Sequence, residues 1–172
     1  MTKLKTTSLS EQITKVSATG DIDKLITLIE QLKNPIDCSE ALRLASFSGN
    51  AECAKLLIPM SDSKANSYAL RLASLKGHIE CVKLLIFVSD PKDENSESLI
   101  FAAMNNHKEC VKLLLPCSDI SKWGCGHWES IDSDMRNAIQ SYYSKISLEQ
   151  SLVENVLPNN NQISKNKKSH KI

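Results

Sequence analysis

Three cysteines recur in one sequence context, and their thiols are the first groups in the chain that could carry chemistry. Cys53, Cys81 and Cys110 follow one another at intervals of 28 and 29 residues, each within a glutamate-cysteine-x-lysine-leucine-leucine segment. Aligned thiols can hold a metal, form disulfides, react as nucleophiles or fill a repeated core position. The chain has no C-x-x-C pair, and equivalent residues on neighbouring helices lie about 8–10 Å apart, too far for a disulfide. The pattern therefore favours a core position, with no metal or cofactor.

A second group of candidates follows the last of these segments, within "PCSDISKWGCGHWES". Cys117, Cys125 and His127 could ligate a metal, or Cys125 could act as a nucleophile with His127 as its base. Their spacing matches no zinc pattern, and residues so close in sequence rarely face each other. Trp123 and Trp128 favour a packed cap instead. An enzyme or metal-binding protein using this region stays open as the alternative function.

The cysteines belong to a longer repeat, which sets the elements that position them. Three units align as "SEALRLASFSGNAECAKLLIPMSD", "SYALRLASLKGHIECVKLLIFVSD" and "SESLIFAAMNNHKECVKLLLPCSD", and "GDIDKLITLIEQL" fits a degenerate earlier unit. Each unit contains two helical patterns separated by a stop such as Gly77. Pro59 and Pro116 follow the second helices, and the Ser-Asp pairs supply turns and caps. One such pair cannot bury its apolar face, but stacked pairs can, which predicts a solenoid.

The units resemble the ankyrin repeat. With the degenerate unit counted as the first of four repeats, the third repeat shows the resemblance best. Its residues 68–71 occupy the family's threonine-proline-leucine-histidine segment, residues 77–78 its glycine-histidine pair, and residues 82–86 its valine-lysine-leucine-leucine-leucine run. The resemblance covers about residues 20–120. Two features depart from it, because serine-led tripeptides replace the threonine-proline opening and each unit is four or five residues shorter than the usual 33.

The missing residues can be placed in the finger that joins successive repeats. Nine residues, "PMSDSKANS", separate Ile58 from Tyr68, against about fourteen in the usual repeat. The short unit is similar to "SDPK"-type arrays of bacteria and large viruses, which implies a host-directed role. Because the finger is truncated, we expect a partner to bind the helical faces.

The resemblance also implies roles for individual positions. His78 and His107 stand where the family's histidine ties one repeat to the next, so we read both as structural. Asn50 replaces this histidine in the second repeat, and Asn106 replaces the glycine in the fourth, so we expect weaker ties at both places. The three repeated cysteines stand where isoleucine or valine is usual.

In ankyrin stacks the first helices line the concave side, and the residues that flank their alanine point into it. Here these are apolar pairs spaced i, i+3, on one face of each helix; Arg43 and Arg71 would form a charged rim beside them. An exposed apolar stripe marks an interaction surface that suits a partner helix. The alternative is that the shorter fingers tighten the curvature and partly bury the stripe within the domain. The stripe residues are Leu44, Phe47, Leu72, Leu75, Phe101 and Met104.

The two ends of the repeat region differ from its middle. Lys15 and Lys24 replace apolar residues of the first repeat, as an N-terminal cap requires. Near the other end, four apolar residues at intervals of four, three and four predict an amphipathic helix that covers the last repeat or, alternatively, binds a partner. These residues are Met135, Ile139, Tyr142 and Ile146.

Composition narrows the function classes. The net charge of +1 over 172 residues gives no overall basic character that would favour binding to nucleic acid or an anionic membrane. No apolar run is long enough to span a membrane, and the N-terminal residues lack the apolar core of a signal peptide. We therefore expect a cytoplasmic protein, or one delivered into a host cell by an unconventional route. The basic tail, with Lys165, Lys167, Lys168 and Lys171, is expected to be solvated and disordered. Contact with nucleic acid or nuclear import through these lysines is the alternative.

Together these observations predict an all-α, ankyrin-like helical-repeat solenoid of about four short repeats with reduced fingers and a C-terminal capping helix. The predicted parts are an N-terminal segment with the first helix (1–19), repeats (20–120), a helical cap (121–157) and the tail (158–172). We expect a monomeric, non-catalytic scaffold for protein–protein interaction, which binds a protein partner and neither membrane nor nucleic acid.

Overall fold

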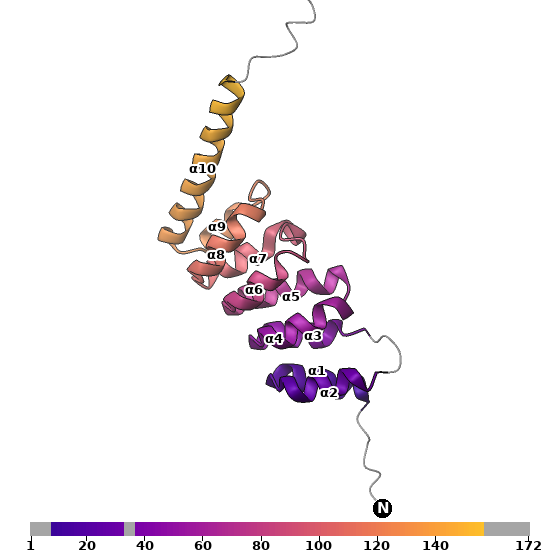
Figure 1. Ribbon diagram of the computed structural model, residues 1–172. Coiled ribbons are helices and arrows are strands. Elements are labelled where there is room, and N and C mark those ends of the chain that lie inside the picture. Colours follow the sequence, from indigo (N-terminus) through magenta and orange to yellow (C-terminus); the bar gives the residue numbers. More distant parts are fainter. Residues whose placement is uncertain (1–7, 33–36, 157–172) are drawn as a thin grey trace, which may run out of the picture. The chain divides into compact units, whose positions relative to one another are not determined.

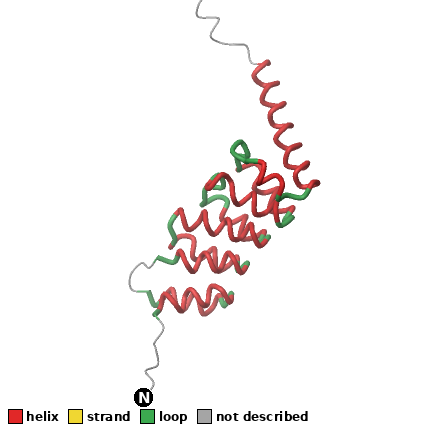
Figure 2. Tube along the Cα trace, turned by 180° about the vertical axis from the view of Figure 1, so that it is seen from behind, coloured by secondary structure: helices red, strands yellow, loops and turns green. Residues whose placement is uncertain are grey.

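The computed structural model describes residues 8–32 and 37–156, and over these ranges the chain is built of helices and turns, with no strand (Figures 1 and 2). The first of its two compact units, which ends at Arg136, contains a row of helix pairs. The pairs are α1 (Leu9–Thr19) with α2 (Ile22–Glu30), α3 (Ser39–Ser48) with α4 (Ala51–Leu57), α5 (Ser63–Lys76) with α6 (Ile79–Leu85), and α7 (Asp93–Met104) with α8 (Lys108–Leu114). Each pair is one repeat, which confirms the predicted all-α solenoid.

The first helix of each pair ends where the sequence places its stop. Gly20, Gly49 and Gly77 have φ angles of 79°, 79° and 74°, a left-handed conformation that glycine adopts without steric cost. Asn106 takes the same conformation in the fourth repeat, with φ 57°, because asparagine tolerates it better than other residues with a side chain.

The second helices continue into short 3-10 turns in two of the repeats. The turns η1 (Ile58–Met60) and η2 (Leu115–Cys117) each have a proline near their start, where its missing N–H costs no hydrogen bond. A Ser-Asp pair follows, and the side chain of Asp62 caps α5 by accepting the N–H of Ala65 at 2.6 Å. These turns replace the finger hairpin, in agreement with its predicted truncation.

In the second, third and fourth repeats, a serine one position before the family's threonine connects the repeat to the turn that follows it. The three serines lie in α3, α5 and α7. Each hydroxyl oxygen accepts the backbone N–H of an aspartate 23 residues later. The pairs are Ser39 with Asp62 at 3.5 Å, Ser67 with Asp90 at 3.1 Å and Ser96 with Asp119 at 2.9 Å. These hydrogen bonds are made by the serine-led tripeptides that replace the threonine-proline opening.

The core lies between the two rows of helices. First helices pack on first helices, in the order α1, α3, α5 and α7, while α2, α4, α6 and α8 form the second row. Lys15 and Lys24 of the first repeat are exposed, although the cysteine that replaces Lys24 in later repeats is buried. Leucines with no exposed surface fill the core, namely Leu25, Leu42, Leu57, Leu70, Leu85, Leu99 and Leu114.

Two further helices follow the repeats, α9 (Cys125–Glu129) and α10 (Ser133–Val156). The four residues predicted to form an amphipathic helix all lie in α10, which confirms the helix; its capping role stays a prediction. The second compact unit begins at Asn137, within α10. The predicted tail, residues 158–172, lies outside the described residues. No described helix is long and apolar enough to cross a membrane.

Candidate functional site

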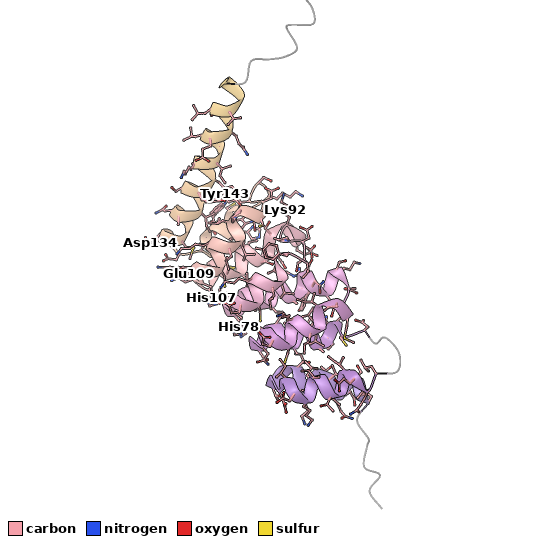
Figure 3. All side chains as sticks on the ribbon, viewed as in Figure 1. His78, Lys92, His107, Glu109, Asp134 and Tyr143 are labelled. Carbon is pink, nitrogen blue, oxygen red and sulfur yellow. The ribbon has the colours of Figure 1, made fainter. Side chains whose placement is uncertain are left out.

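A histidine just before each of the last two second helices ties its repeat to the preceding one. His78 Nε2 lies 3.0 Å from the carbonyl oxygen of Phe47, and His107 Nε2 lies 3.0 Å from that of Leu75. Figure 3 shows both histidines along the same edge of the stack. The structural role predicted for them is confirmed. Because Phe47 and Leu75 belong to the predicted stripe, the ties also fix its backbone.

The asparagines do not weaken these ties, contrary to expectation. Asn50 Nδ2 donates to two carbonyl oxygens of the first repeat, those of Ser17 at 2.8 Å and Ala18 at 3.0 Å. An amide group has two N–H donors, so it can make both bonds at once. Asn106 keeps the left-handed turn, and His107 beside it makes its bond at the same distance as His78.

The six stripe residues lie on α3, α5 and α7, which pack side by side. Phe47 and Met104 are 39% and 45% exposed, and Leu44, Leu72, Leu75 and Phe101 are half-buried. The alanines between them, such as Ala73, are fully buried. The structure thus brings the predicted residues onto adjacent helices, with two of the six side chains exposed and four half-buried. The stripe is partly buried and partly accessible, and its role as an interaction surface stays a prediction.

A cluster of two arginines and a tyrosine lies between the second and third repeats. The Tyr68 ring has the guanidinium carbons of Arg43 and Arg71 at 5.4 Å and 4.9 Å from its centroid, within the range of cation–π attraction. Arg71 also pairs with Glu97 of α7 at 2.9 Å, and Arg43 pairs with Glu40 of its own helix. The predicted charged rim is thus a packed cluster.

A third cation lies on the stripe itself. Lys76 Nζ is 4.5 Å from the centroid of the Phe47 ring. Sequence reasoning missed the roles of Lys76, Tyr68 and Glu97, because these contacts join residues of different repeats. Comparison of the repeats position by position provides one signal, since Tyr68 stands where the neighbouring repeats have glutamate.

A sequence model of ankyrin repeats, comprising three copies, matches residues 16–95 and again residues 42–123. Together these matches span more than half of the chain. The chain belongs to the ankyrin repeat family. Ankyrin repeats are generally protein–protein interaction modules and are typically non-enzymatic. A search of curated protein sequences finds no match to this chain.

The repeated cysteines lie in the core of the ankyrin stack, as predicted. Cys53, Cys81 and Cys110 are at most 1% exposed, and all three are unpaired. Burial raises the pKa of each thiol, and that of Cys81 reaches about 11, with smaller contributions from the Glu80 carboxylate and from Cys53. A protonated, inaccessible thiol is a poor nucleophile.

The second group of candidates lies beyond the last ankyrin repeat. Cys125 is exposed at the start of α9, whereas Cys117 is half-buried in η2. His127 Nδ1 accepts the N–H of Gly124 at 3.1 Å, and this bond occupies one of its two nitrogens. Trp123 and Trp128 pack with their ring centroids 5.0 Å apart. Within residues 8–32 and 37–156, no three His, Cys, Asp or Glu side chains form a group that could hold a metal ion.

Proposed function

We propose that this ankyrin repeat protein is a non-catalytic scaffold that binds a protein partner through the stripe on α3, α5 and α7. The observation that carries the proposal is the exposure of large apolar side chains on α3 and α7, with Phe47 at 39% and Met104 at 45%. On α5, which packs between these helices, Leu72 and Leu75 are half-buried. An apolar surface that spans three helices gains free energy when a partner removes it from water. The histidine ties support this role, because they hold the stripe backbone in place before a partner arrives.

A host-directed role is the more specific form of this proposal. It rests on the similarity of the short repeats to arrays of bacteria and large viruses, and on the truncated finger, which leaves the helical faces as the larger surfaces. In this form the chain acts as a monomer in the cytoplasm of a host cell.

The proposal is tested by pull-down from candidate host lysates, with bound proteins identified by mass spectrometry. Leu75→Asp and Met104→Asp should each abolish capture of the partner, because a buried, unpaired carboxylate at an interface is costly. Leu148→Asp is the matched control, since Leu148 is a 65% exposed leucine of α10, outside the stripe. Circular dichroism should show unchanged helicity for all three variants.

Two results would contradict the proposal. Capture that survives both stripe variants would show that the partner binds elsewhere. Loss of capture with Leu148→Asp alone would identify α10 as the partner-binding element, the alternative raised by its sequence.

A further inference from the structure

An ion pair that joins two neighbouring first helices has no counterpart one repeat earlier. Arg43 and Arg71 occupy equivalent positions in the second and third repeats. Arg71 Nη1 donates to Glu97 Oε2 on the next first helix at 2.9 Å. The residue that would pair with Arg43 in the same way is at the position of Tyr68, which offers an aromatic ring instead of a carboxylate.

Arg43, like Arg71, keeps hydrogen-bonding capacity, because one ion pair engages each guanidinium group. In the described part of the chain its ion pair is with Glu40 of the same helix, whose side chain is 56% exposed. The buried Nε–H groups of both arginines have no acceptor among the residues that the structure describes. A guanidinium group has five donors in a planar fork that matches the two oxygens of a carboxylate.

The two guanidinium groups border a depression of ≈ 360 Å³ that also includes Lys64, Tyr68 and Asp62 in its lining. Three cations and one carboxylate thus line it, and Asp62 is already engaged as the cap of α5. The depression adjoins the stripe, because Phe47 and Leu75 lie four residues after Arg43 and Arg71 and so share a helix face with them. A negatively charged group bound here would lie beside the apolar surface.

We propose that this depression binds a carboxylate side chain of the partner, so that the partner presents an acidic, amphipathic segment to the stripe. The inference rests on the proposed function and specifies its partner. Lys76, which lies on the stripe outside the depression, provides a further cation with no ion pair among the described residues. It lies five residues after Arg71 in α5, about 7.5 Å along the helix axis. A partner helix would therefore carry its acidic residues between one and two turns apart, with apolar residues between them.

The inference is tested by selecting 16-residue peptides from a phage-displayed library on the full chain and measuring the affinity of the tightest by fluorescence anisotropy. We expect the selected peptides to combine Asp or Glu with Leu, Ile or Phe. Replacing the acidic residues by their amides should weaken binding about tenfold, and Arg43→Gln should weaken the acidic peptide but not the amide peptide. A selection without acidic enrichment, or one that yields no binder, would overturn the inference.

Tyr68 offers a matched pair of variants. Tyr68→Glu restores the missing carboxylate, so it should occupy Arg43 and weaken the acidic peptide about tenfold while the urea midpoint of unfolding stays the same or rises. Glutamine has the size of glutamate without its charge, so Tyr68→Gln should weaken peptide binding less than Tyr68→Glu. Equal effects of the two variants would contradict carboxylate recognition. If Leu75→Asp abolishes peptide binding but no charge variant changes it, only this inference fails; if Leu75→Asp has no effect, the proposed function fails.

Discussion

The imidazole Nε2 of His78 lies 3.0 Å from the carbonyl oxygen of Phe47, so one hydrogen bond joins two repeats and also fixes the backbone of an exposed stripe residue. The next repeat makes the same connection between His107 and Leu75. Stability of the stack and geometry of the proposed binding surface thus depend on the same bonds. Changes at the histidines should alter both.

Replacing the His78 side chain should show this coupling. His78→Ala leaves the Phe47 carbonyl without its partner and should lower the free energy of unfolding by about 1 kcal/mol. His78→Asn should retain more stability, because Asn50 makes the equivalent connection in the preceding repeat. Urea denaturation followed by circular dichroism measures both. An alanine variant as stable as the original chain would show that the bond contributes nothing net.

Gly77 should tolerate no side chain. Its φ is +74°, and an added Cβ would lie 2.5 Å from Nδ1 of His107. Gly77→Ala combines backbone strain with displacement of the tie, so the free energy of unfolding should fall by about 2–3 kcal/mol. The midpoint of urea denaturation reports this loss.

Gly126 provides the matched control, since an added Cβ there meets nothing within 4 Å. Gly126→Ala should leave stability within about 0.5 kcal/mol of the original or raise it slightly, because it lies in α9 and alanine favours the helix. A similar loss in both variants would mean that the repeat contact at Gly77 is not the cause.

The serine that links α5 to the following turn should contribute measurably. Ser67 is 5% exposed, and its hydroxyl oxygen accepts the N–H of Asp90. Ser67→Ala leaves that donor unpaired and should cost about 1–2 kcal/mol of unfolding free energy. Ser63→Ala, at the exposed start of the same helix, is expected to have little effect. If the two variants lose the same stability, the serine link is not a significant contact.

Alkaline pH should destabilise the fold through Cys81. Burial raises the pKa of this thiol from its ordinary value of 9.0 to about 11. Between pH 9 and pH 11 the unfolded chain therefore loses a proton that the folded chain retains, so the free energy of unfolding falls as pH rises. The loss is on the order of 2 kcal/mol. Cys81→Val should flatten this slope in urea denaturations at pH 8, 9, 10 and 11; an unchanged slope would assign it to other groups.

Thiol alkylation should separate the exposed cysteine from the buried ones. Iodoacetamide at pH 8 should modify Cys125 first, because it is exposed, whereas Cys81 is fully buried and its thiol stays protonated at this pH. Mass spectrometry of digested samples measures each rate, and Cys81 should react only when urea unfolds the chain. Rapid reaction of Cys81 in the native protein would contradict its place in the core.

Much of the fold could be predicted because each repeat carries the same local sequence pattern. The glycine stops, the apolar residues around Cys81 and the Ser-Asp turns recur at intervals of 28 or 29 residues, so the same local conformation is required each time. Family resemblance then placed the stripe residues on the first helices. These inferences depend on neighbours in the chain, which sequence periodicity reports directly.

The sequence by itself determined the number of helix pairs, where they stop and that the three repeated cysteines are core residues. Only the tertiary structure decided that the Tyr68 ring lies between two guanidinium groups, that Asn50 makes two bonds to the first repeat, and that Phe47 and Met104 stay accessible. The physical reason is that side-chain contacts between repeats depend on the distance and rotation of one helix pair relative to the next. Packing sets both quantities, and no local sequence pattern contains them.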